Sequence, residues 1–174
     1  MTQNEAGRAE ALSCLQHAIA DTQGTIRAFD MKANVLGIFL TVALGMTNFA
    51  VRQSPTPISK FFILVSWILG LAALAVLGLV LYPHKSTLNE RQLGDYVPSA
   101  TYFLHDVHAA HDKDVDARAA HALATDWVSE LTYIHMKLSL IRDFKHAKFI
   151  RAMQLTAATL VASGFASLSF VWYW

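Results

Sequence analysis

Three long apolar stretches without a single Asp, Glu, Lys or Arg limit the folds open to this chain of 174 residues. They cover residues 33–51, 61–82 and 152–174. A helix that crosses a bilayer needs about 20 mostly apolar residues at about 1.5 Å per residue. All three stretches meet that length, so we predict an all-α integral membrane protein with three transmembrane helices. An outer loop at residues 52–60 separates the first two spans, and a polar block at residues 83–151 precedes the third.

The polar leader, residues 1–32, is expected to form a helix that continues into the first span. One set of positions recurs every three or four residues and is apolar except for one threonine: Leu12, Leu15, Ile19, Thr22, Ile26, Phe29 and Ala33. No proline lies between residues 4 and 50. The leader also carries acidic residues, unlike the basic start of a secretory signal, and we expect it to remain in the mature protein.

A second stripe with the same spacing leads toward the third span. It consists of Trp127, Leu131, Ile134, Leu138, Ile141, Lys145 and Lys148, and it is apolar as far as Ile141. We expect Asp112 or Asp114 to cap this helix. Neither stripe is stable in water alone, so we predict that the two helices pack side by side as a bundle extending the spans. Short helices within residues 84–111 would cover the remaining apolar surface.

The basic residues near the membrane ends predict the orientation, because Lys and Arg accumulate on the cytoplasmic side. Nine lie on the side of the leader and the polar block: Arg27, Lys32, Lys85, Arg91, Lys137, Arg142, Lys145, Lys148 and Arg151. The short loop between the first two spans carries only Arg52 and Lys60. We therefore predict a bacterial inner-membrane protein with a cytoplasmic N-terminus and a periplasmic C-terminus.

Composition and motifs count against several function classes. The net charge of +1 gives no sign of a nucleic-acid partner, and the lone Cys14 excludes an intrachain disulfide. Nucleophile arrangements and phosphate loops are absent, so we predict no enzyme activity. The run from His105 to Asp112 holds three histidines and two aspartates. It matches no metal-ligand spacing, and we interpret it as a solvated face and predict no metal site.

The inner boundary of the first span carries an acid that needs a partner. Asp30 and Lys32 must lie at or below the lipid headgroups, because a charge at the bilayer centre costs at least about 2.5–3.5 kcal/mol. Lys32 can reach lipid phosphate, but Asp30 calls for a cation, and Arg142, Lys145 or Lys148 could supply one. Two interpretations stay open, a structural ion pair and part of a ligand or gating site. The basic cluster is likewise either a topology signal or a phosphate site formed by Arg142 and Lys145.

Small residues form two columns inside the spans. Gly37, Thr41 and Gly45 are spaced four apart, as are Thr159, Ser163 and Ser167. Such columns allow helices to approach closely. They would serve either packing within one protomer or contact between protomers.

These residues resemble a known family. The sequence Asp30-Met-Lys32-Ala33 after a cytoplasmic helix is similar to the D-x-K-A start of the first span in Pycsar-type transmembrane effectors. The segment from Lys145 to Arg151 resembles the entry of that family into its last span. The resemblance follows the three-span order over most of the chain, and Asp30, Lys32, Ala33 and Lys145 match the family pattern.

The resemblance implies an antiviral membrane effector. Such an effector senses cyclic CMP or cyclic UMP made by a partner cyclase, and it impairs the inner membrane so that infection is abortive. On this interpretation the ligand-binding residues would be Asp30, Lys32, Arg142, Lys145, Tyr102 and Trp127, with the cations holding phosphate and the aromatic rings stacking on the base. We expect a homo-oligomer in the lipid bilayer that requires no cofactor.

Two other functions remain open. A constitutive membrane scaffold would dock a soluble partner through its cytoplasmic helices. A membrane-bound metal enzyme would use the residues of the His105–Asp112 run.

Overall fold

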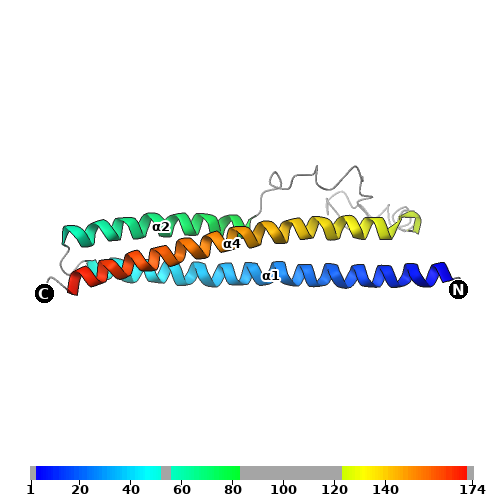
Figure 1. Cartoon of the computed structure of the whole chain (residues 1–174), viewed down its shortest axis with the longest axis horizontal. Coiled ribbons are helices and arrows are strands. Elements are labelled where there is room, and N and C mark those ends of the chain that lie inside the picture. Colours follow the sequence, from blue (N-terminus) through cyan, green and yellow to red (C-terminus); the bar gives the residue numbers. More distant parts are fainter. Residues whose placement is uncertain (1–2, 52–55, 83–122, 172–174) are drawn as a thin grey trace, which may run out of the picture. The chain divides into compact units, whose positions relative to one another are not determined.

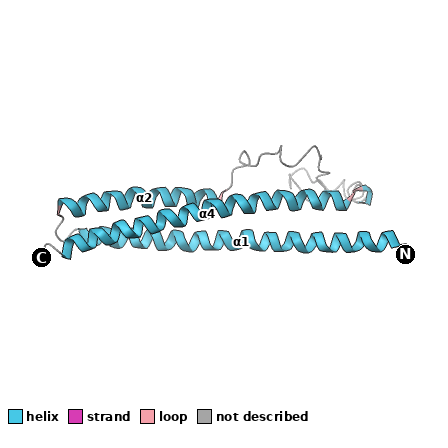
Figure 2. Ribbon diagram, in the orientation of Figure 1, coloured by secondary structure: helices cyan, strands magenta, loops and turns pink. Residues whose placement is uncertain are grey.

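The computed structural model describes residues 3–51, 56–82 and 123–171, and all of the regular structure in these ranges is helical (Figure 2). The helices are α1 (Gln3–Val51), α2 (Pro57–Leu81) and α4 (Trp127–Val171) (Figure 1). Each is long and apolar enough to cross a bilayer. The chain is therefore a multi-pass membrane protein with an all-α fold, as the three apolar stretches predicted.

Helix α1 is continuous from Gln3 to Val51, which confirms the predicted passage from the leader into the first span. The polar Thr22 is buried in its stripe, but its hydroxyl donates to the carbonyl oxygen of Ala18 at 2.8 Å. The polar group is thus satisfied within the helix, and Thr22 can occupy an otherwise apolar position without an unpaired donor.

Helix α2 begins at Pro57, a few residues before the apolar stretch itself. The hydroxyl of Thr56 accepts the backbone N–H of Ser59, and Pro57 follows at the first helical position. This pairing of a capping threonine with a proline is a common way to start a helix. The helix ends at Leu81, one residue before the end of the predicted apolar stretch.

Helix α4 begins at Trp127, later than the sequence suggested. The carbonyl oxygen of Asp126 accepts the N–H of Glu130, and its carboxylate accepts the hydroxyl of Ser129 at 2.7 Å. Asp126 therefore caps this helix. The expected caps, Asp112 and Asp114, lie outside the described residues, as do the short helices expected within 84–111.

The chain divides into two compact units. Unit 1 comprises Met1–Gly24 and Leu88–Leu140. In its described part, Ile19 of α1 is buried against Leu131 and Ile134 of α4. Flanking positions of the same predicted stripes, Leu12, Leu15 and Leu138, complete this seam. The guanidinium of Arg8 pairs with Asp126 at 2.8 Å, so within this unit the two helices run parallel.

Unit 2 comprises Thr25–Thr87 and Ile141–Trp174. Three helices pack within it, and α2 runs antiparallel to α1, since Leu77 and Val80 lie against Ala33 whereas Ala73 lies against Leu40. Gly70 permits a close approach, because a Cβ atom there would lie 2.7 Å from a methyl carbon of Leu44. The α4 segment runs parallel to α1, as expected for the first and third of three crossings.

The outer surface of unit 2 is apolar. Large side chains such as Ile38, Phe61, Leu71 and Phe165 expose half or more of their surface. An exposed apolar surface of this extent is suited to lipid rather than water.

Candidate functional site

An ion pair joins α1 and α4 within unit 2, just before the uncharged part of the first span. The ammonium of Lys145 donates to the carboxylate of Asp30. The Lys145 side chain is 5% exposed, whereas that of Asp30 is 34% exposed. Of the three cations that could have neutralised Asp30, the structure therefore places Lys145 beside it.

The burial of Lys145 follows from helix periodicity. Lys145 continues the stripe that includes Leu138 and Ile141, and the same face of α4 later carries the buried Ala152. A lysine that is buried at such a position needs an acid, because an unpaired buried charge is costly. The carboxylate is the more open member of the pair, so an anion approaching Lys145 from solvent would compete with Asp30.

Aromatic side chains surround the same level of the two helices. The ring of Phe29 lies 5.6 Å from that of His146 and 5.9 Å from that of Phe149, centroid to centroid. On α4 the ammonium of Lys148 lies 5.5 Å from the centroid of the Phe144 ring. The ion pair is thus flanked by groups able to stack on, or shield, a bound ring.

The other predicted ligand residues are placed differently. Arg142 pairs with its neighbour Asp143 at 2.9 Å and precedes Lys145 by one helical turn. Lys32 is exposed and lines a groove between α1 and α4. Trp127 is half-buried in unit 1, and Tyr102 lies outside the described residues.

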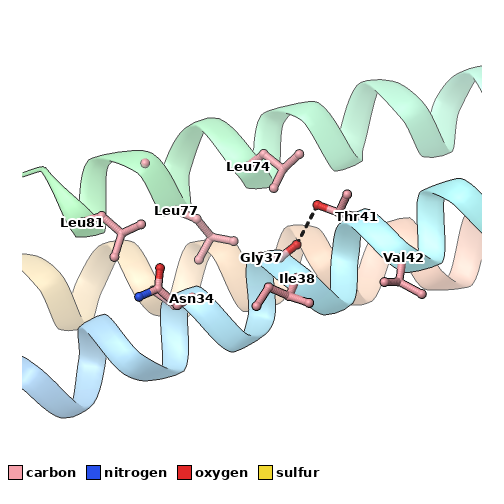
Figure 3. Close-up of a pocket in the computed structure, with 10 residues that line it drawn as sticks. Asn34, Gly37, Ile38, Thr41, Val42, Leu74, Leu77 and Leu81 are labelled. Carbon is pink, nitrogen blue, oxygen red and sulfur yellow. Dashed lines mark hydrogen bonds between the residues drawn. The ribbon is translucent and has the colours of Figure 1, made fainter.

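A second groove lies between α1 and α2 (Figure 3), with a volume of about 460 Å³. Asn34 and Gly37 of α1 face Leu77 and Leu81 of α2 across it. The hydroxyl of Thr41 donates to the Gly37 carbonyl within α1. Of the column Gly37, Thr41 and Gly45, the latter two are exposed, so packing within this protomer uses the column only at Gly37.

The column on α4 is used inside the protomer. The hydroxyl of Ser163 lies 2.6 Å from that of Ser66 on α2 and accepts the hydroxyl of Thr47 on α1 at 3.3 Å. The buried Ser66 also donates to the Thr159 carbonyl at 3.4 Å. We call Thr47, Ser66, Thr159 and Ser163 the hydroxyl seam. The sequence indicated Thr159 and Ser163 through their spacing, but not Thr47 or Ser66.

Within the described ranges, no three His, Cys, Asp or Glu side chains gather as metal ligands. The His105–Asp112 run lies outside the residues that the structure describes. The aromatic contacts of Phe29 were also not predicted. The sequence indicated them only indirectly, because Phe29 belongs to the apolar stripe and lies three residues before Lys32.

The protein is thus a multi-pass membrane protein. Its three described helices are long enough to span a bilayer, and an ion pair lies at one end of the spans. At the family level, residues 14–172 match the Pycsar effector protein domain. The chain belongs to this family and is thus an anti-phage membrane effector, which agrees with the resemblance seen in the sequence. Neither the curated proteins nor the solved structures contain a match.

Proposed function

We propose that this effector senses cyclic CMP or cyclic UMP made by a partner cyclase and then impairs the inner membrane, causing abortive infection. Membership of the Pycsar effector family supports the cyclase partner. The observation on which the proposal depends is the ion pair between Asp30 and Lys145, which connects the two longest helices next to the spans. We propose no catalytic step for the protein itself.

The ion pair suits a ligand with a single negative charge. A cyclic nucleotide monophosphate carries one anionic phosphate and one base. Lys145 would bind the phosphate. Arg142, one turn earlier, would break its ion pair with Asp143 and bind the phosphate as well. Asp30 would then be free to accept hydrogen bonds from the base. Phe29 or His146 is positioned to stack beside it, and Tyr102 is a further candidate. Trp127 lies on the same continuous helix as Lys145 but about 27 Å away along its axis, at about 1.5 Å per residue, so it is too far to stack on this base.

Ligand binding would be coupled to the spans through α1 and α4. When phosphate replaces Asp30 on Lys145, the contact that fixes the two helices at this level is lost. The ligand favours the changed packing only to the extent that it binds that state more tightly. We propose that the changed state assembles as a homo-oligomer whose spans breach the bilayer. Because Lys and Arg accumulate on the cytoplasmic side, we propose that the site faces the cytoplasm and the C-terminus the periplasm.

Binding to the full chain in lipid nanodiscs tests this site. The wild type should bind cyclic CMP or cyclic UMP, measured by calorimetry, with linear 5′-CMP and 5′-UMP as ligand controls. Lys145→Gln should lower the affinity at least about tenfold, the loss expected for one charge-assisted contact of about 1.5–3 kcal/mol. Asp30→Asn should raise it, because the competing charge is gone while the amide oxygen can still accept a hydrogen bond from the base.

A double variant separates ligand binding from folding. Asp30→Asn combined with Lys145→Gln leaves no unpaired charge, so the fold should be retained while binding is lost. Lys137→Gln, about two turns earlier on the same helix, is the matched control and should bind normally. Full binding by the double variant would contradict the proposed site. A wild type that binds neither nucleotide would instead favour the scaffold function.

A further inference from the structure

A groove between α1 and α4 in unit 2 differs in chemistry from the one in Figure 3. Its volume is about 410 Å³. Val35 and Phe39 line it from α1, and Phe149 and Met153 line it from α4. From Lys32 to Phe39 it extends about 10 Å along the helix at about 1.5 Å per residue, into the uncharged part of the span.

One charged side chain lies at the end of this groove that is farther from the middle of the span. Lys32 lines it and is the last charged residue before the first apolar stretch. Among the described residues, no acid forms an ion pair with Lys32. Phe29, one turn before Lys32, contacts the ring of the exposed His146, so a second polar group lies near the same end. The groove therefore has a cationic mouth and an apolar floor.

We propose that this groove is a binding site for an anionic phospholipid of the adjacent leaflet. The phosphate would bind Lys32, with His146 as a second donor, and one acyl chain would lie along Val35, Phe39 and Met153. Basic sites at membrane-facing clefts between helices select anionic headgroups. Among the described residues, Lys32 is the only polar side chain that lines the groove, which would leave a nucleotide base without hydrogen-bond partners.

The groove of Figure 3 provides an internal control, because it flanks the same helix and has a similar volume. Its polar side chains are the uncharged Asn34 and Thr41, so it offers nothing to an anionic headgroup. Lys60, an exposed lysine near the start of α2, provides the matching control for charge.

Native mass spectrometry of the full chain can count retained lipids. With mixed phosphatidylglycerol and phosphatidylcholine, the wild type should retain phosphatidylglycerol preferentially. Lys32→Gln should reduce that retention at least about threefold, and Val35→Trp should do the same by filling the groove. Lys32→Arg should keep it. Lys60→Gln and Ile38→Trp, which fills the Figure 3 groove, should leave it unchanged.

Two results would overturn the lipid site. One is equal retention of the two lipids by the wild type. The other is a loss in Lys60→Gln as large as that in Lys32→Gln, which would show that only overall charge matters. Circular dichroism on each variant should match the wild type, and because Lys32→Arg and Lys32→Gln are similar in size, a difference between them reports the charge.

Discussion

The two units of the protein place polar and apolar side chains in opposite ways. In unit 1, Ile19, Leu131 and Ile134 are buried, while Arg8 and Asp126 form an exposed ion pair. In unit 2 large apolar side chains are exposed, and serine and threonine hydroxyls meet in the interior. Each unit is built for a different solvent. Unit 1 excludes water from an apolar seam, whereas unit 2 presents apolar groups to lipid and satisfies its polar groups internally.

The forces that hold each unit together therefore differ. Apolar burial drives packing in water, but lipid tails are as apolar as leucine, so packing in the membrane depends on close fit and on hydrogen bonds. Gly70 against Leu44 provides the close fit, and the hydroxyl seam provides the hydrogen bonds. The partly buried ion pair of unit 2 is a third kind of contact, and one that a charged ligand can exchange.

Truncating one isoleucine in each unit should give the largest contrast. Ile19→Ala removes a side chain that is 3% exposed and should destabilise unit 1 by about 2–5 kcal/mol. Ile38→Ala removes one that is 67% exposed on the same helix, and lipid tails fill the space, so the effect should be under about 0.5 kcal/mol. Hydrogen exchange of α4 amides in bicelles measures both. Equal effects would mean that Ile19 and Ile38 face the same solvent.

Adding a charge to the exposed surface of each unit should have the opposite pattern, with the large effect in unit 2 and the small one in unit 1. Ala72→Arg, near the middle of α2, should disfavour membrane insertion by about 2.5–3.5 kcal/mol. Ala11→Arg, on the exposed surface of unit 1, should have almost no effect. A glycosylation-based insertion assay measures the inserted fraction. Full insertion of Ala72→Arg would contradict the assignment of Ala72 to the lipid-exposed middle of the span.

Removing a hydrogen bond of the hydroxyl seam should change stability less than the isoleucine truncation or the added charge. Ser66→Ala removes the contacts to Ser163 and to the Thr159 carbonyl, and interhelical hydrogen bonds in membranes average about 0.6 kcal/mol. Ser167→Ala is the control, because its hydroxyl donates only within α4, to the Ser163 carbonyl. Thermal unfolding in detergent should show a lower Tm for Ser66→Ala alone. Equal Tm shifts would assign no stabilising role to the seam.

The smallest effect is a pH dependence at the start of α4. The pKa of Asp126 is lowered by the hydroxyl of Ser129, then by Arg8 and by the backbone N–H of Val128. Because the folded pKa lies below the unfolded one, this stabilisation is complete above the unfolded pKa and is lost as the pH falls through the folded pKa. Protection of the first-turn amides of α4 should therefore decline in acid below about pH 4. Asp126→Asn should abolish that decline, and its persistence in the variant would contradict the assignment.

Much of the fold follows from residue spacing. The three uncharged stretches predicted the spans, and the stripes through Ile19 and Leu131 predicted the seam of unit 1. The start of α4 at Trp127 could not be predicted with the same certainty, because Asp112, Asp114 and Asp126 are all competent caps. The sequence also gave no sign that Glu130 is buried, since its side chain is charged.

The site was predicted less completely. That Asp30 needed a cation followed from the cost of charge near lipid, but the choice of Lys145 over Arg142 or Lys148 depends on the rotation of α4. Periodicity indicated that rotation, since Lys145 lies on the stripe through Ile141. The groove that Lys32 shares with Phe149 could not be predicted, because it forms only when α1 and α4 are packed together.

Dye release from sealed vesicles tests the central claim most directly, because it joins the ion pair to the membrane. Vesicles holding the full-length wild type, with the cytoplasmic face outward, should release dye when cyclic CMP or cyclic UMP is added. Those holding the Asp30→Asn and Lys145→Gln double variant should not respond. Release by the wild type that is the same with and without nucleotide, or an undiminished response from the double variant, would contradict the account.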